Sequence, residues 1–102
     1  MTDRELLELA AKAAGYYEAL KMPYYADCGL GGFNPLNNDG DALRLAVKLN
    51  LVYMPYPNDM AVRITRLDLP EFIEHYGNTN DPYAATRRAI VRAAAEIGRS
   101  QP

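Results

Sequence analysis

The segment over residues 28–50, CGLGGFNPLNNDGDALRLAVKLN, gathers glycine, asparagine and aspartate immediately before an apolar stretch. Such residues occur in dinucleotide-binding loops, P-loops and calcium-binding loops, and the spacing decides among them. A dinucleotide-binding loop needs glycine where this chain has Asn34, and a P-loop needs lysine where it has Asp41. A calcium loop would need ligating side chains at Pro35 and Ala46, which have none. We therefore expect neither a cofactor nor a metal ion.

The same segment has the residues that start a helix. Asn38 and Asp39 are both preferred N-cap residues, and Asp41 falls in the first turn, where a negative charge is favourable. The free N–H groups of this turn could also hold a small anion. The carboxylates of Asp39 and Asp41 would oppose such an anion, so capping is the favoured interpretation.

His75 is the only histidine and the one candidate for acid–base chemistry near neutral pH. A hydrolytic triad would pair it with Cys28 or with Ser100, but Ser100 lies at the end of the chain. Glu71 and Glu74 lie close to it in sequence, but not at the spacing of a recognised metal-ligand set. We expect that the protein is not an enzyme and that the single cysteine is a reduced thiol.

Aromatic residues and loop residues supply the candidates for ligand binding. Tyrosine offers a large contact area with a polar tip, and loops commonly carry function. Arginine could meet a phosphate group. Tyr53, in contrast, is expected in the core. The candidate ligand-binding residues are Tyr24, Tyr25, Phe33, Asn34, Asp39, Asp41, Arg44 and Arg87.

Hydrophobic periodicity predicts three helices in a single domain over residues 1–102. Thr2 and Glu5 have the spacing of a capping box, and the helix that they begin is expected to extend to residue 20. The second helix is so apolar that we expect other elements to cover most of it. Asp81 and Pro82 begin the last helix, and Gly98 is expected to end it in a left-handed cap. The expected elements are a helix over 2–20, a long loop over 21–38, a helix over 39–49, a small sheet over 51–76 and a helix over 81–98.

Three segments predict the sheet. Residues 51–56 and 60–66 are rich in β-forming residues, and the turn residues between them indicate a hairpin. Pro55 cannot donate to a β-ladder, so its strand is expected at an edge. Residues 71–76 fit either a short helix or a third strand, and a strand is favoured because an isolated hairpin is marginally stable. The sequence therefore predicts a layered α/β (α+β) domain in which three helices pack with a mainly antiparallel three-stranded sheet, in the order α-α-β-β-β-α.

The composition narrows the classes of partner. The formal net charge is −2, although residues 82–102 contain four arginines and one glutamate. With an isoelectric point of about 5.3, the chain lacks the broad basic surface of a nucleic-acid-binding domain. We expect no nucleic-acid partner and interpret the arginines as a solvated helix face. No apolar run is long enough to span a membrane, and the first residues lack the pattern of a signal peptide.

Two stretches, FNPLNNDGDALRLAVKLN and NDPYAATRRAIVRAAAEIGR, resemble the small phage proteins of the phage ABA sandwich domain family. Many members have tryptophan before the Asn-Pro pair, where this chain has Phe33. The resemblance implies a phage or prophage gene and an α/β layered fold. With the absence of a signal-peptide pattern, it leads us to expect the protein in the cytoplasm of the bacterial host. It implies no catalytic residue, because the family has no established activity.

These observations predict a non-enzymatic phage or prophage accessory protein that acts by binding. We expect it to form a homo-oligomer, most simply a dimer, and to bind a host or phage protein. The alternative is a protein that binds and sequesters a small molecule or nucleotide, and so counters a host pathway.

Overall fold

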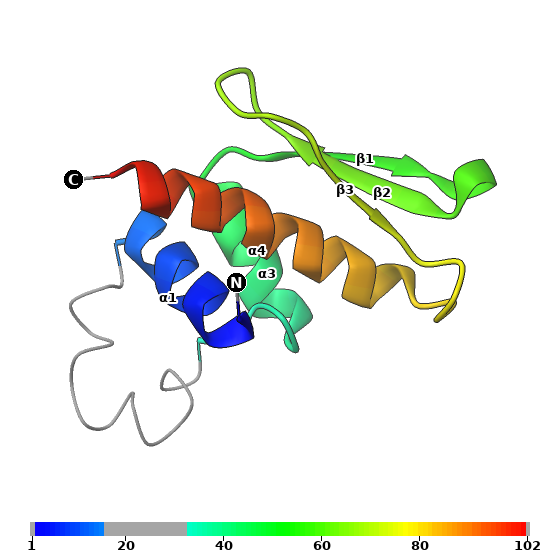
Figure 1. Ribbon diagram of the computed structural model, residues 1–102, viewed down its shortest axis with the longest axis horizontal. Coiled ribbons are helices and arrows are strands. Elements are labelled where there is room, and N and C mark those ends of the chain that lie inside the picture. The colour runs from blue at the N-terminus through cyan, green and yellow to red at the C-terminus, as the bar shows by residue number, and fades with distance from the viewer. Residues whose placement is uncertain (1, 16–32, 102) are drawn as a thin grey trace.

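The computed structural model describes residues 2–15 and 33–101 of the chain. The described elements are α1 (Asp3–Ala13), α3 (Asp39–Lys48), β1 (Val52–Tyr56), the short 3₁₀ turn η2 (Pro57–Asp59), β2 (Ala61–Thr65), β3 (Phe72–His75) and α4 (Pro82–Ser100). This order confirms the predicted mixed α/β fold, and residues 72–75 form the third strand rather than a helix (Figure 1).

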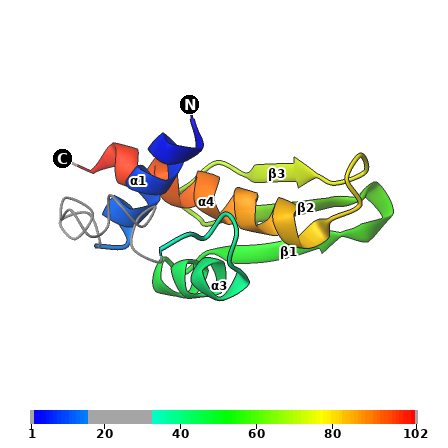
Figure 2. The same cartoon turned by 90° about the horizontal axis from the view of Figure 1, so that it is seen from below.

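The described helices all lie on one side of the sheet, and α4 is the central helix of this layer (Figures 1 and 2). It packs on β2 and β3, while α1 and α3 pack against α4 itself. The strands are antiparallel in the order β1-β2-β3, so β1 is an edge strand, as Pro55 predicts. No described helix covers the opposite face of the sheet.

The middle strand supplies the buried side of the sheet. Val62 and Ile64 are almost fully buried and form one core with buried alanine, valine and isoleucine side chains of α4. Successive strand residues point to opposite faces, so Arg63 lies on the open face. The register places Tyr53 opposite Ile64, on the same face as the helices.

Helix α1 begins at the predicted capping box, in which Thr2 and Glu5 each accept a backbone hydrogen bond. The helix ends at Ala13, not at residue 20, because Gly15 has a φ of 85°. Its N–H donates to the Lys12 carbonyl oxygen, which is the arrangement of a left-handed helix end. Residues 16–20 lie outside the described part of the chain.

Helix α4 begins as predicted, with Asp81 accepting from the Ala84 N–H and Pro82 in the first turn. The prediction for Gly98 is wrong, because this glycine lies inside the helix and the chain continues helically to Ser100. A Cβ atom on Gly98 would lie 2.8 Å from the Leu9 carbonyl carbon. The glycine therefore allows α4 and α1 to approach closely, and it does not end the helix.

The α4 arginines do not simply form the solvated helix face that the sequence predicts. Arg88 pairs with Asp3 of α1, and Arg92 pairs with Glu74 of β3. The guanidinium of Arg92 also lies 5.5 Å from the centre of the Phe72 ring. Each of these partly exposed pairs contributes little on its own, but together they orient α4 relative to its neighbours.

Candidate functional site

Helix α3 is much more exposed than its composition predicts. Its buried residues are Ala42 and Leu45, which face the core with the C-cap residue Leu49. Leu43 and Val47 are four residues apart and therefore form a second apolar stripe on a different side of the helix. Their side chains are 64% and 68% exposed. The expectation that other elements cover most of this helix is wrong for the described residues.

A groove lies beside this stripe, between α3, α4 and β1. Its volume is about 390 Å³. Tyr53 of β1 and Tyr83 of α4 line it and remain 53% and 69% exposed. The expected core position of Tyr53 is therefore wrong, because α4 packs on β2 and β3 and leaves the helix-side face of β1 open. The other lining residues are Asp39, Ala42, Leu43, Ala46, Thr86, Arg87 and Ile90.

The polar groups of the groove bond to the protein itself. Arg87 pairs with Asp39 at 2.6 Å, and its Nε donates to the Leu36 carbonyl oxygen at 2.8 Å. The Thr86 hydroxyl donates to the Pro82 carbonyl oxygen. Arg87 therefore fastens the segment before α3 to α4, and what the groove presents outward is mainly apolar and aromatic.

Two of the predicted ligand-binding residues, Asp39 and Arg87, line this groove. Three others hold the start of α3. The Asn34 N–H donates to the Asp41 carboxylate, and Arg44 pairs with the same carboxylate at 2.5 Å.

The capping interpretation of this segment is confirmed, since the Asn38 side chain accepts from the Asp41 N–H. Phe33 packs at the margin of the core. Tyr24 and Tyr25 lie outside the described residues.

Sequence reasoning missed Leu43, Tyr53 and Tyr83 as site residues. One signal for an exposed apolar stripe was available in the sequence. Leu43 and Val47 are four residues apart, and other residues of the same helix already form its core stripe. The edge position of β1, indicated by Pro55, was a second signal that Tyr53 could be partly exposed.

Two further hollows among the described residues are less suited to binding a ligand or a partner. One lies on the open face of the sheet, has a volume of about 440 Å³ and includes Arg63 and His75 in its lining. Arg63 pairs with Glu71 and lies over the Tyr56 ring, and its buried Nε has no hydrogen-bond partner among the described residues. His75 is exposed, and the described residues contain no group of three side chains that could hold a metal ion.

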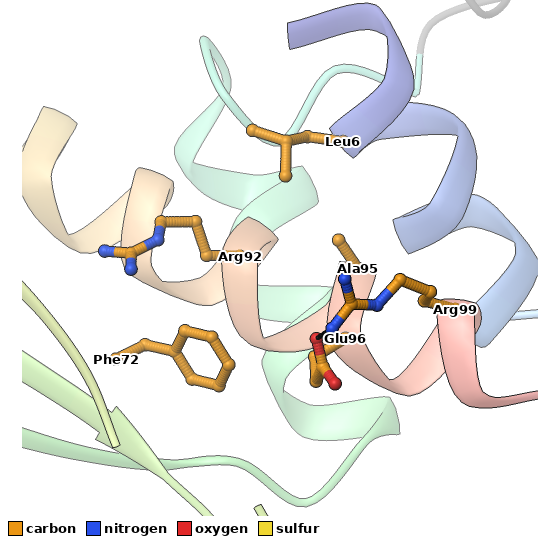
Figure 3. Close-up of a pocket in the computed structure, with 6 residues that line it drawn as sticks. All are labelled: Leu6, Phe72, Arg92, Ala95, Glu96 and Arg99. Carbon is orange, nitrogen blue, oxygen red and sulfur yellow. Dashed lines mark hydrogen bonds and ion pairs between the residues drawn. The ribbon is translucent and has the colours of Figure 1, made fainter. Parts of the chain in front are cut away.

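Figure 3 shows the smaller hollow, of about 170 Å³, between α1, α4 and β3. Its two arginines do not converge on a common point. Arg99 turns toward Glu96, with which it pairs, whereas the guanidinium of Arg92 points away from Arg99 beside Phe72 (Figure 3). This arrangement does not form a receptor for an anion.

Comparison of the chain with protein-family models, with curated proteins and with solved structures finds no match. Among the helices of the described residues, none combines the length and the apolar character that a membrane span requires.

Proposed function

We propose that the protein acts by binding another protein chain through the surface formed by Leu43, Val47, Tyr53 and Tyr83, here called the α3 surface. The observation that supports this proposal is that these four side chains are each more than half exposed. Three of them, Leu43, Tyr53 and Tyr83, line one groove, and Val47 lies one turn after Leu43 on α3. Contiguous apolar patches on a soluble domain commonly mark interaction sites, and tyrosine is enriched at such interfaces. The resemblance to phage proteins supports assignment as a phage or prophage accessory protein.

The form of the α3 surface favours a protein partner over a small molecule. A small-molecule site normally encloses its ligand and offers a few convergent polar groups. Here Val47 extends the apolar surface beyond the groove lining, and Arg87 already bonds to Asp39 and Leu36. The nucleotide alternative has weaker support, because Arg44 does not line the groove and Arg87 has these partners.

An environment-sensitive dye tests whether the groove is a binding surface. Anilinonaphthalene sulfonate combines aromatic rings with an anionic group and becomes fluorescent in apolar sites. We expect Leu43→Glu and Tyr83→Glu each to weaken dye binding by about tenfold, since each removes apolar contact area. Both positions are exposed and helical, so circular dichroism should show an intact fold.

The matched control is Leu67→Glu, which introduces the same charge at a fully exposed leucine in the turn after β2. It should leave dye binding unchanged. Equal dye binding by the wild type and the two groove variants would contradict the proposed function.

A further inference from the structure

We infer that the partner of the α3 surface is a chain segment that presents an arginine side chain flanked by apolar residues. The inference rests on the proposed function and names the chemistry of the segment that the surface binds. It follows from three features of the groove, which are an exposed carboxylate at one end, tyrosine rings that carry no cation and an otherwise apolar lining. The arginine meets the carboxylate, and its apolar neighbours cover the rest of the groove.

The charge that one end of the groove presents to solvent is a carboxylate. Arg87 and Asp39 pair at 2.6 Å, but the side chain of Arg87 is only 18% exposed, whereas that of Asp39 is 68% exposed. Arg87 also donates to the Leu36 carbonyl oxygen. The second carboxylate oxygen of Asp39, Oδ2, accepts no hydrogen bond from the described residues. The exposed member of the pair is therefore the acid, and it retains an acceptor for a charged donor.

An aromatic ring lies at the same end of the groove. Tyr83 precedes Arg87 by one turn of α4, and both side chains line the groove. Because Arg87 holds Asp39, the Tyr83 ring and the Asp39 carboxylate flank the same end. An arginine from a partner can stack on the ring while it donates to the carboxylate, since its guanidinium is planar and carries several donors.

The tyrosine rings of the groove are open to a cation from outside the chain. Two other rings of the fold, those of Tyr56 and Phe72, already have an arginine over them, with the guanidinium carbon 5.4 and 5.5 Å from the ring centre. Tyr53 and Tyr83 have no such cation among the described residues. Both are more than half exposed, so a partner side chain can reach them.

Other kinds of segment fit the groove less well. An acidic segment would find little of Arg87 to contact, because that guanidinium is mostly buried and already has two acceptors. Arg44, the exposed arginine of α3, does not line the groove. A wholly apolar segment would cover Asp39 and leave its Oδ2 without a donor, which is unfavourable.

Two matched peptides test the charge of the partner segment. N-acetyl-Leu-Arg-Leu-amide carries the inferred cation, and the same peptide with citrulline in place of arginine is neutral and nearly isosteric. NMR titration of the folded chain gives both dissociation constants. We expect the arginine peptide to bind about fivefold tighter, because ring stacking and an exposed ion pair each add a small increment. Equal affinities, or no binding of the arginine peptide at about 10 millimolar, would overturn the inference.

Free arginine tests whether the partner is a chain segment. It carries the same guanidinium but lacks the apolar flanks that cover the rest of the groove. At the concentration that saturates the surface with peptide, free arginine should not displace the peptide. Displacement would overturn the assignment to a chain segment and indicate a small cationic molecule.

Two substitutions test whether the charge preference arises in the groove. Asp39→Asn keeps an acceptor for Arg87 but removes the charge, and Tyr83→Leu keeps an apolar side chain but removes the ring. Each should reduce the preference to about twofold, with little change for the citrulline peptide. Tyr83→Phe retains the ring and should retain the preference. A preference that survives both Asp39→Asn and Tyr83→Leu would overturn the inference.

Asp59→Asn is the matched control for the change in net charge. Asp59 is an exposed aspartate of η2 that does not line the groove. Its substitution should leave the fivefold preference unchanged. A loss equal to that of Asp39→Asn would show a general effect of net charge and overturn the inference. Circular dichroism of each variant verifies the fold.

The outcomes separate this inference from the proposed function. Anilinonaphthalene sulfonate is anionic, so Asp39→Asn should bind it at least as tightly as the wild type, and weaker dye binding would contradict the assigned charge. Dye binding that responds to Leu43→Glu and Tyr83→Glu, together with peptides bound without charge preference, would overturn the inference and leave the binding surface intact. Dye binding that ignores those two variants would instead contradict the proposed function.

Discussion

At the scale of single residues, Arg66 and Asp68 show how one ion pair fixes a local turn. Arg66 donates to both carboxylate oxygens of Asp68, at 2.5 and 2.7 Å, and a third bond at 2.9 Å reaches the Leu49 carbonyl oxygen at the end of α3. The hydrogen bonds between Arg66 and the carboxylate lower the pKa of Asp68, and they raise the pKa of Arg66. The pair therefore connects the turn after β2 to α3.

The lowered pKa of Asp68 predicts a direction of pH dependence. A carboxyl group with a lowered pKa in the folded state stabilises the fold fully above its unfolded pKa, and this contribution is lost as the pH falls through the folded pKa. A carboxyl-detected NMR titration should place the Asp68 midpoint below the usual aspartate value. Arg66→Gln should move this midpoint upward, and an unchanged midpoint would show that Arg66 is not the cause.

At the scale of elements, the contact between α1 and α4 depends on Gly98. In an unobstructed helix, alanine in place of glycine would stabilise by roughly 1 kcal/mol. Here the added methyl group would collide with the Leu9 backbone, so we expect Gly98→Ala to destabilise by about 2 kcal/mol. Chemical denaturation measures the difference in the free energy of unfolding.

Gly40→Ala is the matched control for this substitution. Gly40 lies in the first turn of α3, where a Cβ atom would lie 3.2 Å from the flexible end of the Arg44 side chain and 3.2 Å from the Asn38 Oδ1. We expect little change in stability there. A neutral or stabilising Gly98→Ala would disprove the close approach of α1 and α4 that the structure shows.

The same elements show how far the sequence could be used for prediction. The element order, the caps at Asn38 and Asp81 and the β1–β2 hairpin follow from short-range patterns, so they were predictable. The role of Gly98 depends on the backbone of another helix, which no local pattern contains. The end of α1 is hidden in the sequence because the apolar stripe continues at helical spacing past Gly15, although this glycine is itself a stop signal.

At the scale of the whole molecule, the position of α4 determines which surfaces remain available. Because α4 packs on β2 and β3, it leaves Tyr53 of β1 open, while α3 packs against α4 and keeps Leu43 and Val47 exposed. Two residues of the groove, Asp39 and Arg87, were predicted from the sequence. The aromatic and apolar residues of the groove could not be predicted, because the exposure of an apolar residue depends on where distant elements dock.

The described residues thus form two apolar surfaces that could compete for association. The first is the α3 surface, and the second is the open face of the sheet, where Ile73 and Tyr56 are partly exposed beside Arg63. The first surface presents exposed apolar and aromatic side chains beside a groove, whereas the second has an ion pair that resists burial. The central claim is that association uses the first surface.

Concentration-dependent NMR spectra of the wild type measure this choice most directly. Between micromolar and millimolar protein, we predict that chemical-shift changes concentrate at Leu43, Val47, Tyr53 and Tyr83, while Ile73 on the open face stays unchanged. Shift changes concentrated at Tyr56, Arg63 and Ile73, with an unchanged α3 surface, would contradict the account.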